Sequence, residues 1–496
     1  MDKAAVALGI VAGIVLASVV FGGAMVRRVK MNPREYMIGG RSFGPIFLWL
    51  LLAGEIYTTF TFLGAAGWAY GKGAPAFYIL CYGSVAYIIS YFLLPPIWRF
   101  AKEHELLTGP DYLAQAFGSK WLGVLVAIVG FVFVVPYVTL QLTGIQLLLR
   151  IAGYGALNAT VAVGVAFGLI ALFVFVSGLR GAAWASVIKD VLVLVAVLFA
   201  GIVLPIHFFG SPANVVSRVL QAHPNWMTLA GGAAPNGTTW FVSTVLLTSL
   251  GFYMWPHSMA AIYSARSEDA LRRNAIFLPF YQLVLLFVYF AGFTALLVIP
   301  GLKGSEADQS FMLVVQHYYS PAVLGFIAGA GVLAGLIPAA AQILGAASIF
   351  SKNVLGDVFG IAASDRERTL ATRVLVLVVA ALALGFWLIA RTSLVGLLLI
   401  GYNGVTQFFP GVFFSLVWRR ATALGVGAGI VAGIATVVYF AATGQTSVSG
   451  INAGFFALLI NVVVCVVLSR VIGSVRERSL QSIGPIAIYK VKRNVD

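Results

Sequence analysis

One carboxylate stands inside an otherwise apolar stretch of the sequence. The stretch reads LLLAGEIYTTFTFLGAAGW, and Glu55 is its only charged residue. A charge near the middle of a membrane span costs about 2.5–3.5 kcal/mol on insertion scales, so such residues usually serve a function. We therefore predict that Glu55 binds a proton or a cation. The alternative is a structural role, in which a protonated Glu55 forms a hydrogen bond with a neighbouring helix.

Polar and aromatic side chains gather beside Glu55 and in a second apolar stretch. The second stretch reads LLTSLGFYMWPHSMAAIY, where Pro256 removes a backbone hydrogen bond and interrupts the helix. Hydroxyls and rings at such interruptions can line a pocket for a small solute, although rings also serve packing. For His257 an equal alternative is a structural role, in which its ring forms a hydrogen bond with the backbone carbonyl that Pro256 leaves free. The predicted lining residues are Tyr57, Thr58, Thr59, Tyr253, Trp255 and His257.

Two further sets of polar residues fall within apolar segments. In one interpretation Lys189 and Asp190 form a buried pair that compensates charge or relays protons, which makes them candidate coupling residues. The equal alternative is that both lie at the cytoplasmic rim, where lysine extends its ammonium to water. Gln141 follows a proline kink, and Asn403 lies in GYNGVTQFFPG. We predict that both amides line the pocket, with polar contacts between helices as the alternative.

The composition indicates that lipid surrounds the elements that carry these residues. Of the 496 residues, 61% are apolar and 9% are charged, whereas soluble domains carry about 25% charged residues. The net charge of +15 is spread over short loops, which argues against nucleic-acid binding. The sequence contains neither a phosphate-binding loop nor a metalloprotease or hydrolase motif, so we predict no enzyme and no metal site. We also predict no cofactor beyond a coupling ion, H⁺ or Na⁺, and no obligate protein partner.

Apolar windows long enough to cross a bilayer recur along the whole chain and predict an all-α membrane protein. Thirteen spans are expected, and the first is predicted to be a true span rather than a signal peptide. The windows lie near 4–25, 45–70, 75–98, 122–148, 158–178, 186–208, 240–264, 274–300, 321–350, 370–390, 393–418, 421–442 and 451–470.

The basic residues predict how the spans are oriented. Of the 31 lysines and arginines, 25 fall in alternate connections, among them the C-terminal segment. Because cytoplasmic loops carry the basic excess, we predict an inner-membrane protein with its N-terminus outside and its C-terminus in the cytoplasm.

The two interrupted spans, the second and the seventh, lie five spans apart. An odd offset inverts one five-helix unit relative to the other, and inverted repeats of transporters place their binding site between two interrupted helices. The predicted divisions are a first helix and loop (1–44), two five-helix repeats (45–208 and 240–418) separated by an extracytoplasmic loop (209–239), and two further helices with a basic tail (419–496).

Four stretches, in this order, resemble motifs of the sodium/solute symporter family. They are YMIGGRSFGP (36–45), LLTGPDYLAQAFGSK (106–120), GLRGAAWASVIKDVL (178–192) and WPHSMAAIYSARSEDALRRNA (255–275). The resemblance runs to about residue 420 and implies the leucine-transporter fold.

The chain departs from that family at the usual sodium site. Sodium-coupled members carry two hydroxyl residues on the ninth helix, where Ile337 and Pro338 stand here. A frequent aspartate of the sixth helix is Ser186, and Lys189 replaces a usual glutamine. Hard cations need oxygen ligands. The resemblance therefore implies a dismantled sodium site, with the amine of Lys189 as a candidate for the vacated position.

Within the family, the stretches at 52–80, 135–144 and 336–354 look most like the bacterial monocarboxylate permeases. The resemblance implies a symporter that imports a small carboxylate such as lactate or pyruvate, driven by a proton or sodium gradient. The alternatives are another small solute (an amino acid, pantothenate or a sugar) and a channel or transport-like sensor.

Overall fold

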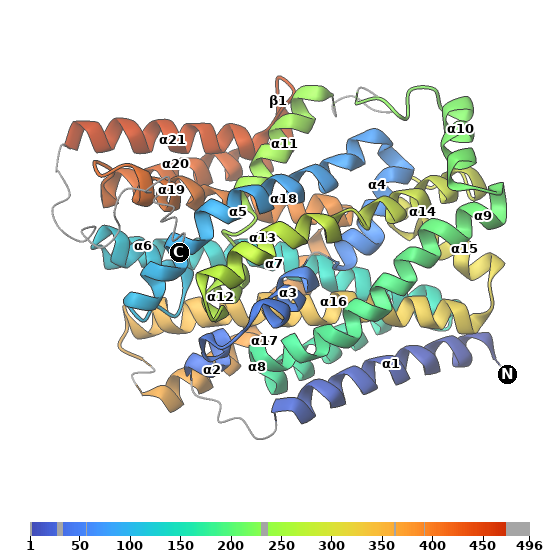
Figure 1. Cartoon of the computed structure of the whole chain (residues 1–496), viewed down its shortest axis with the longest axis horizontal. Coiled ribbons are helices and arrows are strands. Elements are labelled where there is room, and N and C mark those ends of the chain that lie inside the picture. Colours follow the sequence, from blue (N-terminus) through green and yellow to red (C-terminus); the bar gives the residue numbers. More distant parts are fainter. Residues whose placement is uncertain are drawn as a thin grey trace, which may run out of the picture.

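The computed structural model describes residues 2–26, 33–55, 57–229, 237–361, 364–390 and 392–472. Long helices run side by side along the longest axis of the molecule (Figure 1). Apart from helices and their connections, the described residues contain one short antiparallel hairpin, β1 (Ser447–Val448) with β2 (Ile451–Asn452). The predicted all-α membrane fold is confirmed. The predicted basic tail beyond residue 472 and the basic residues Arg27, Arg28 and Lys30 lie outside the described residues.

The helices of the first half precede the 230–236 gap. They are α1 (Lys3–Val26), α2 (Pro33–Ile38), α3 (Pro45–Gly54), α4 (Ala65–Lys72), α5 (Tyr78–Glu103), α6 (Gly109–Phe117), α7 (Lys120–Ala152), α8 (Ala159–Leu198), α9 (Leu204–Phe209) and α10 (Pro212–Ala222). Short 3₁₀ or π segments join some of them, namely η1 (Gly39–Arg41), η2 (Phe60–Gly64), η3 (Ala74–Phe77) and η4 (Phe199–Val203).

The second half continues in the same manner. Its helices are α11 (Thr238–Gly251), α12 (Pro256–Ser264), α13 (Glu268–Gln282), α14 (Leu285–Val298), α15 (Ser310–Tyr318), α16 (Pro321–Ile349), α17 (Asp365–Ile389), α18 (Leu394–Val405), α19 (Phe409–Val417), α20 (Ala423–Ala442) and α21 (Ala453–Ile472). Its short segments are η5 (Gly304–Gln309), η6 (Phe350–Gly356) and η7 (Thr406–Phe408).

The apolar helices of the described residues fall in the thirteen predicted windows, but not all of them are long. Ten helices of the described chain are long and apolar enough to cross a membrane, and three shorter apolar helices accompany them: Pro45–Gly54, Ala159–Val174 and Thr238–Gly251. Two of the three are halves of the predicted second and seventh spans, which are short because each span is interrupted. The third is the first part of α8, which contains the fifth predicted span and the beginning of the sixth.

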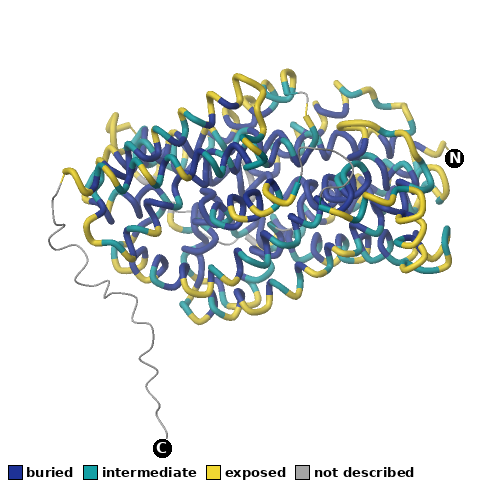
Figure 2. Tube along the Cα trace, turned by 90° about the horizontal axis from the view of Figure 1, so that it is seen from above, coloured by how far each residue is buried: buried dark blue, intermediate teal, exposed yellow. Residues whose placement is uncertain are grey.

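The centre of the molecule is built around α16. In the most apolar part of this span, 83% of the residues are buried, whereas in that of α1 28% are buried. Glycine and alanine allow this burial, because small residues let helix backbones approach closely: a Cβ on Gly325 would lie 2.7 Å from the carbonyl oxygen of Ala7, and one on Gly335 would lie 2.8 Å from Thr59. Buried residues fill the interior, and exposed ones lie on the outer turns (Figure 2). Many of the exposed residues are large and apolar, as a lipid-facing surface requires.

Candidate functional site

The first interrupted helix ends at Gly54, and a buried lysine meets its end. The last carbonyls of a helix lack intrahelical partners. Lys189 on α8 donates a hydrogen bond from Nζ to the Gly54 carbonyl oxygen at 2.6 Å. The side chain of Lys189 is 0% exposed and that of Asp190, whose Oδ1 lies 2.9 Å from Nζ, is 6% exposed. Neither side chain therefore extends to the surface of the molecule, as the alternative for Lys189 required.

The charges at this helix end have a physical reason. A helix C-terminus carries a partial negative charge, so a cation there is stabilised by the helix dipole as well as by the carbonyl. Burial of an unpaired ammonium costs several kcal/mol, and the neighbouring carboxylate of Asp190 offsets that cost. Ser186 lies one turn before Asp190 and donates its hydroxyl to the carbonyl of Ala182 at 3.0 Å. Lys189 is thus the group of α8 that binds the end of α3.

Hydroxyl and amide side chains supply hydrogen-bond partners for the other backbone groups of the first interruption. The Gln141 Oε1 atom on α7 accepts hydrogen bonds from the Thr59 hydroxyl at 2.7 Å and from the Thr59 N–H at 3.3 Å. The Thr58 N–H donates to Thr61 Oγ1 at 2.9 Å, and the Phe60 N–H donates to Thr58 Oγ1 at 3.1 Å. Because lipid offers no partners, these side chains replace the missing helical bonds.

The second interruption separates α11 from α12. Trp255 adopts an extended backbone (φ −67°, ψ 143°), and Pro256 follows as the first residue of α12, a position that needs no N–H donor. Aromatic rings surround this interruption. The ring of Trp255 lies 4.9 Å from Tyr137, 5.2 Å from Tyr402 and 5.8 Å from His257, measured between centroids. Packing of rings therefore holds the second interruption.

Glu55 joins the two interruptions. Its Oε2 atom accepts a hydrogen bond from the Ser258 hydroxyl at 3.2 Å and lies 3.9 Å from His257 Nε2. Tyr137 of α7 adds a second element to this cluster, because its ring packs on Trp255 of the second interruption. Among the described residues of the two interruptions, Glu55 Oε1, His257 Nδ1, Gln141 Nε2 and Trp255 Nε1 are buried without a hydrogen-bond partner. The arrangement leaves a carboxylate oxygen, a ring nitrogen and two N–H donors for an ion, a proton or a solute.

The remaining predicted residues lie at different distances from this cluster. Tyr57 donates its hydroxyl to the Tyr281 carbonyl at 3.2 Å, beside the first interruption. Tyr253 is buried, and its ring lies 4.9 Å from that of Phe252. Asn403 faces elsewhere, because its Oδ1 atom points at Gly454 of α21.

Three cluster residues were not among the predicted lining residues. Ser258 follows His257 directly, and Tyr137 precedes Gln141 by one helical turn, so sequence spacing places Tyr137 on the same face of α7 as that glutamine. Tyr402 stands next to Asn403, and its ring rather than the amide reaches Trp255. Neighbours along a helix point about 100° apart, so the motif around 401–411 could not tell which of the two turns inward.

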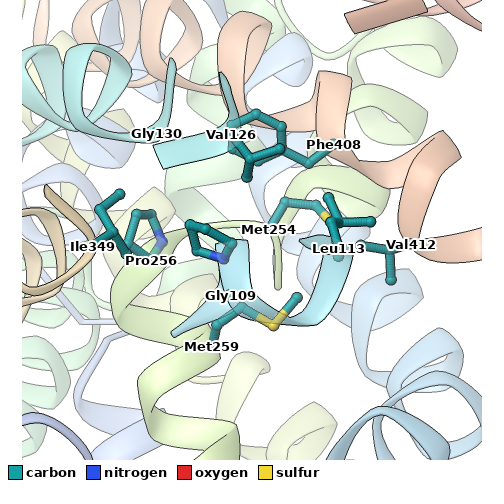
Figure 3. A pocket seen from close by; sticks show the side chains of 11 residues that line it. Gly109, Leu113, Val126, Gly130, Met254, Pro256, Met259, Ile349, Phe408 and Val412 are labelled. Atoms are coloured by element: carbon teal, nitrogen blue, oxygen red, sulfur yellow. The ribbon is translucent and has the colours of Figure 1, made fainter. Parts of the chain in front are cut away.

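A small apolar cavity lies against the second interruption (Figure 3). Pro256 and Met254 line it from the interruption, Gly109 and Leu113 from α6, and Phe408 from η7. Its volume is about 20 Å³, which leaves room for roughly one water molecule. Apolar side chains thus close off this side of the interruption.

Comparison with known proteins identifies the family of the chain. The profile of the sodium:solute symporter family matches residues 36–433. The uncharacterized symporter YhjB of Bacillus subtilis (strain 168) is 42% identical over 474 residues, which cover 93% of this chain and 96% of that protein. A monocarboxylate transport permease protein of Rhizobium johnstonii is 30% identical over 404 residues, which cover 79% of each chain.

A solved structure shares the fold. It is the substrate-bound, outward-open state of a Na⁺-coupled sialic acid symporter, with a TM-score of 0.80 at 16% identity, covering 96% of this chain and 100% of that chain. The fold and the two interrupted helices define a multi-pass helical membrane protein. The chain belongs to the sodium:solute symporter family. It is a symporter by family and not an enzyme.

Proposed function

We propose that this symporter imports a small monocarboxylate, such as lactate or pyruvate, by alternating access and that a proton drives it. The single observation that supports proton coupling is the hydrogen bond from the buried amine of Lys189 to the Gly54 carbonyl oxygen, at 2.6 Å. A protein ammonium already occupies the end of α3, where a transported cation would otherwise receive backbone oxygen. Ile337 and Pro338, both buried in α16, stand where sodium-coupled relatives carry hydroxyl residues, and neither has a side-chain oxygen.

The geometry of the second interruption supports a carboxylate as the solute. The first-turn N–H groups of α12, those of His257 and Ser258, have no intrahelical acceptor, and the N-terminus of a helix carries a partial positive charge. Trp255 and Tyr137 supply apolar ring faces beside these groups. A short carboxylate needs both features, donors for its oxygens and rings for its carbon chain. The 30% identity to the Rhizobium permease supports the same class.

In this proposal Glu55 carries the coupled proton. It touches both interruptions, so its protonation changes the attraction between α12 and the end of α3. A protonated Glu55 also removes the negative charge that would repel a carboxylate at α12. Proton and solute therefore bind better together than apart, which is the requirement for symport. We further propose that the protein lies in the cytoplasmic membrane with its N-terminus outside and its C-terminus in the cytoplasm.

The test is uptake of labelled lactate and pyruvate by proteoliposomes under separately imposed gradients. We expect accumulation with an acidic exterior in the absence of sodium, and none with a sodium gradient at clamped pH. Liposomes without protein serve as the control for passive entry of the protonated acids. Uptake driven by sodium alone would contradict proton coupling. Accumulation of proline or a sugar, without either carboxylate, would contradict the substrate class.

A further inference from the structure

A groove on the outer surface of the bundle lies beside the first interruption. It has a volume of about 600 Å³ and runs between α3, α8 and α13. Ile46 of α3 and Phe277 and Phe280 of α13 line it, and these side chains are 79%, 60% and 67% exposed. The groove opens to the lipid-facing side of an apolar bundle, so its occupant comes from the membrane.

The length of the groove suits one hydrocarbon chain. Its lining on this side extends from Arg273 to Val284, which corresponds to roughly 17 Å at 1.5 Å per residue. The hydrocarbon core of a bilayer is about 30 Å thick, so this length is about one leaflet. An acyl chain that enters at the Arg273 end would reach the middle of the bilayer at Val284.

Polar groups mark the Arg273 end. The Arg273 guanidinium is bound to Asp269 at 2.8 Å, and both side chains are 62% exposed, which leaves further guanidinium donors for a phosphate. Asn274 is 2% exposed and lines the groove. Its amide nitrogen donates to the carbonyls of Ala270 and Pro45 at 2.7 and 3.2 Å, whereas Oδ1 has no partner among the described residues. A headgroup hydroxyl would satisfy that buried oxygen.

The floor of the groove contacts the first interruption. The ring of Trp49 lies 5.0 Å from that of Tyr281, which in turn lies 4.8 Å from the ring of Tyr57. The carbonyl of Tyr281 accepts the Tyr57 hydroxyl. A chain in the groove would therefore fill the space between α3 and α13 directly behind the residues that follow Glu55.

We propose that this groove is a binding site for an anionic glycerophospholipid, with its phosphate at Arg273, a headgroup hydroxyl at Asn274 and one acyl chain along α13. The site is separate from the solute cluster and does not depend on which solute is carried. A second lipid-facing groove provides the contrast. It has a volume of about 440 Å³ and is lined by apolar residues alone, including Ile89, Leu250 and Phe413. It offers nothing that selects a headgroup.

Quenching of Trp49 fluorescence by brominated phospholipids tests the site. The full-length protein is reconstituted in phosphatidylcholine vesicles that contain a low fraction of brominated phosphatidylglycerol or brominated phosphatidylcholine. The Trp49 signal is the difference between the protein and Trp49→Phe. We expect phosphatidylglycerol to quench it about fivefold more effectively, the effect of one basic residue on an anionic lipid.

Three variants separate the site from lipid that merely surrounds the protein. Arg273→Gln should abolish the preference for phosphatidylglycerol while chain contact persists. Leu194→Phe, which fills the groove from α8, should reduce quenching of Trp49 by both lipids, whereas Leu250→Phe in the apolar groove should change neither. Equal quenching by the two lipids, or a preference that survives Arg273→Gln, would show lipid contact without a site and overturn the proposal. Because Arg273 is exposed, its substitution tests the headgroup contact even if Leu194→Phe does not fold.

Discussion

The two interrupted helices are held in different ways. At the first, charged and polar side chains bind the free backbone: Lys189 binds Gly54, and Gln141 binds Thr59. At the second, rings pack around Trp255, and a proline begins the next helix. The first interruption therefore contains ionisable groups whose charge can change, whereas the rings of the second fix the shape of the space beside it. Glu55 is the ionisable residue of the first interruption that contacts the second, through Ser258 and His257.

The largest effect should follow replacement of the buried ammonium. Lys189→Met leaves the Gly54 carbonyl and the Asp190 carboxylate without their partner, and breaking a buried ion pair costs about 3–5 kcal/mol. We expect a marked fall in thermal stability of the purified protein and loss of uptake. The double variant Lys189→Met, Asp190→Asn should recover part of the stability without recovering proton-driven uptake. A single variant that retained proton-driven accumulation would refute the role of Lys189.

The next effect should separate coupling from folding. Glu55→Gln keeps the shape and still accepts the Ser258 hydroxyl, but it cannot take up or release a proton. We expect normal stability, and we expect the pH dependence of solute affinity to disappear, where coupling of two ligands typically changes affinity about 5–150-fold. Solute affinity measured by binding across a pH series provides the readout. Persistence of the wild-type pH dependence would assign the proton to another group.

A smaller effect should come from the amide that holds the first interruption. Gln141→Leu removes the acceptor of two Thr59 hydrogen bonds, at about 1–3 kcal/mol for each buried group left unpaired. We expect weaker solute binding, seen as a raised KM. Gln407 is the matched control, since it binds the Gly454 carbonyl of α21 at 3.4 Å and accepts from Asn461 at 3.0 Å. Gln407→Leu should lower stability with little change in KM, and equal KM changes in the two variants would remove the distinction.

The smallest effect should come from the ring at the second interruption. Trp255→Phe keeps an aromatic face toward Tyr137 but reduces its area, at a cost of about 0.5–1.5 kcal/mol for such a pair. We expect a shift in preference toward bulkier carboxylates, with coupling to the proton intact. Competition of lactate uptake by carboxylates of increasing size measures it. Loss of proton coupling in this variant would show that the two interruptions do not divide charge from shape.

The sequence alone determined the membrane class, the helical fold and the positions of both interruptions. Lipid imposes these features locally, because an apolar window, a carboxylate beside Gly54 and a proline after Trp255 each act within one segment. It did not determine where one span passes into the next, since α8 continues from the fifth predicted span into the sixth.

The contacts of the polar residues depend on how the helices pack in the tertiary structure. Lys189 fitted a buried site and the cytoplasmic rim equally well, and its contact with Gly54 depends on how α8 packs on α3, 135 residues away along the chain. In the same way, Tyr402 turns to Trp255 while Asn403 turns to α21, a choice made by helix rotation in the packed bundle. Contacts between distant segments arise from packing, and a pattern within one segment carries no record of its neighbours.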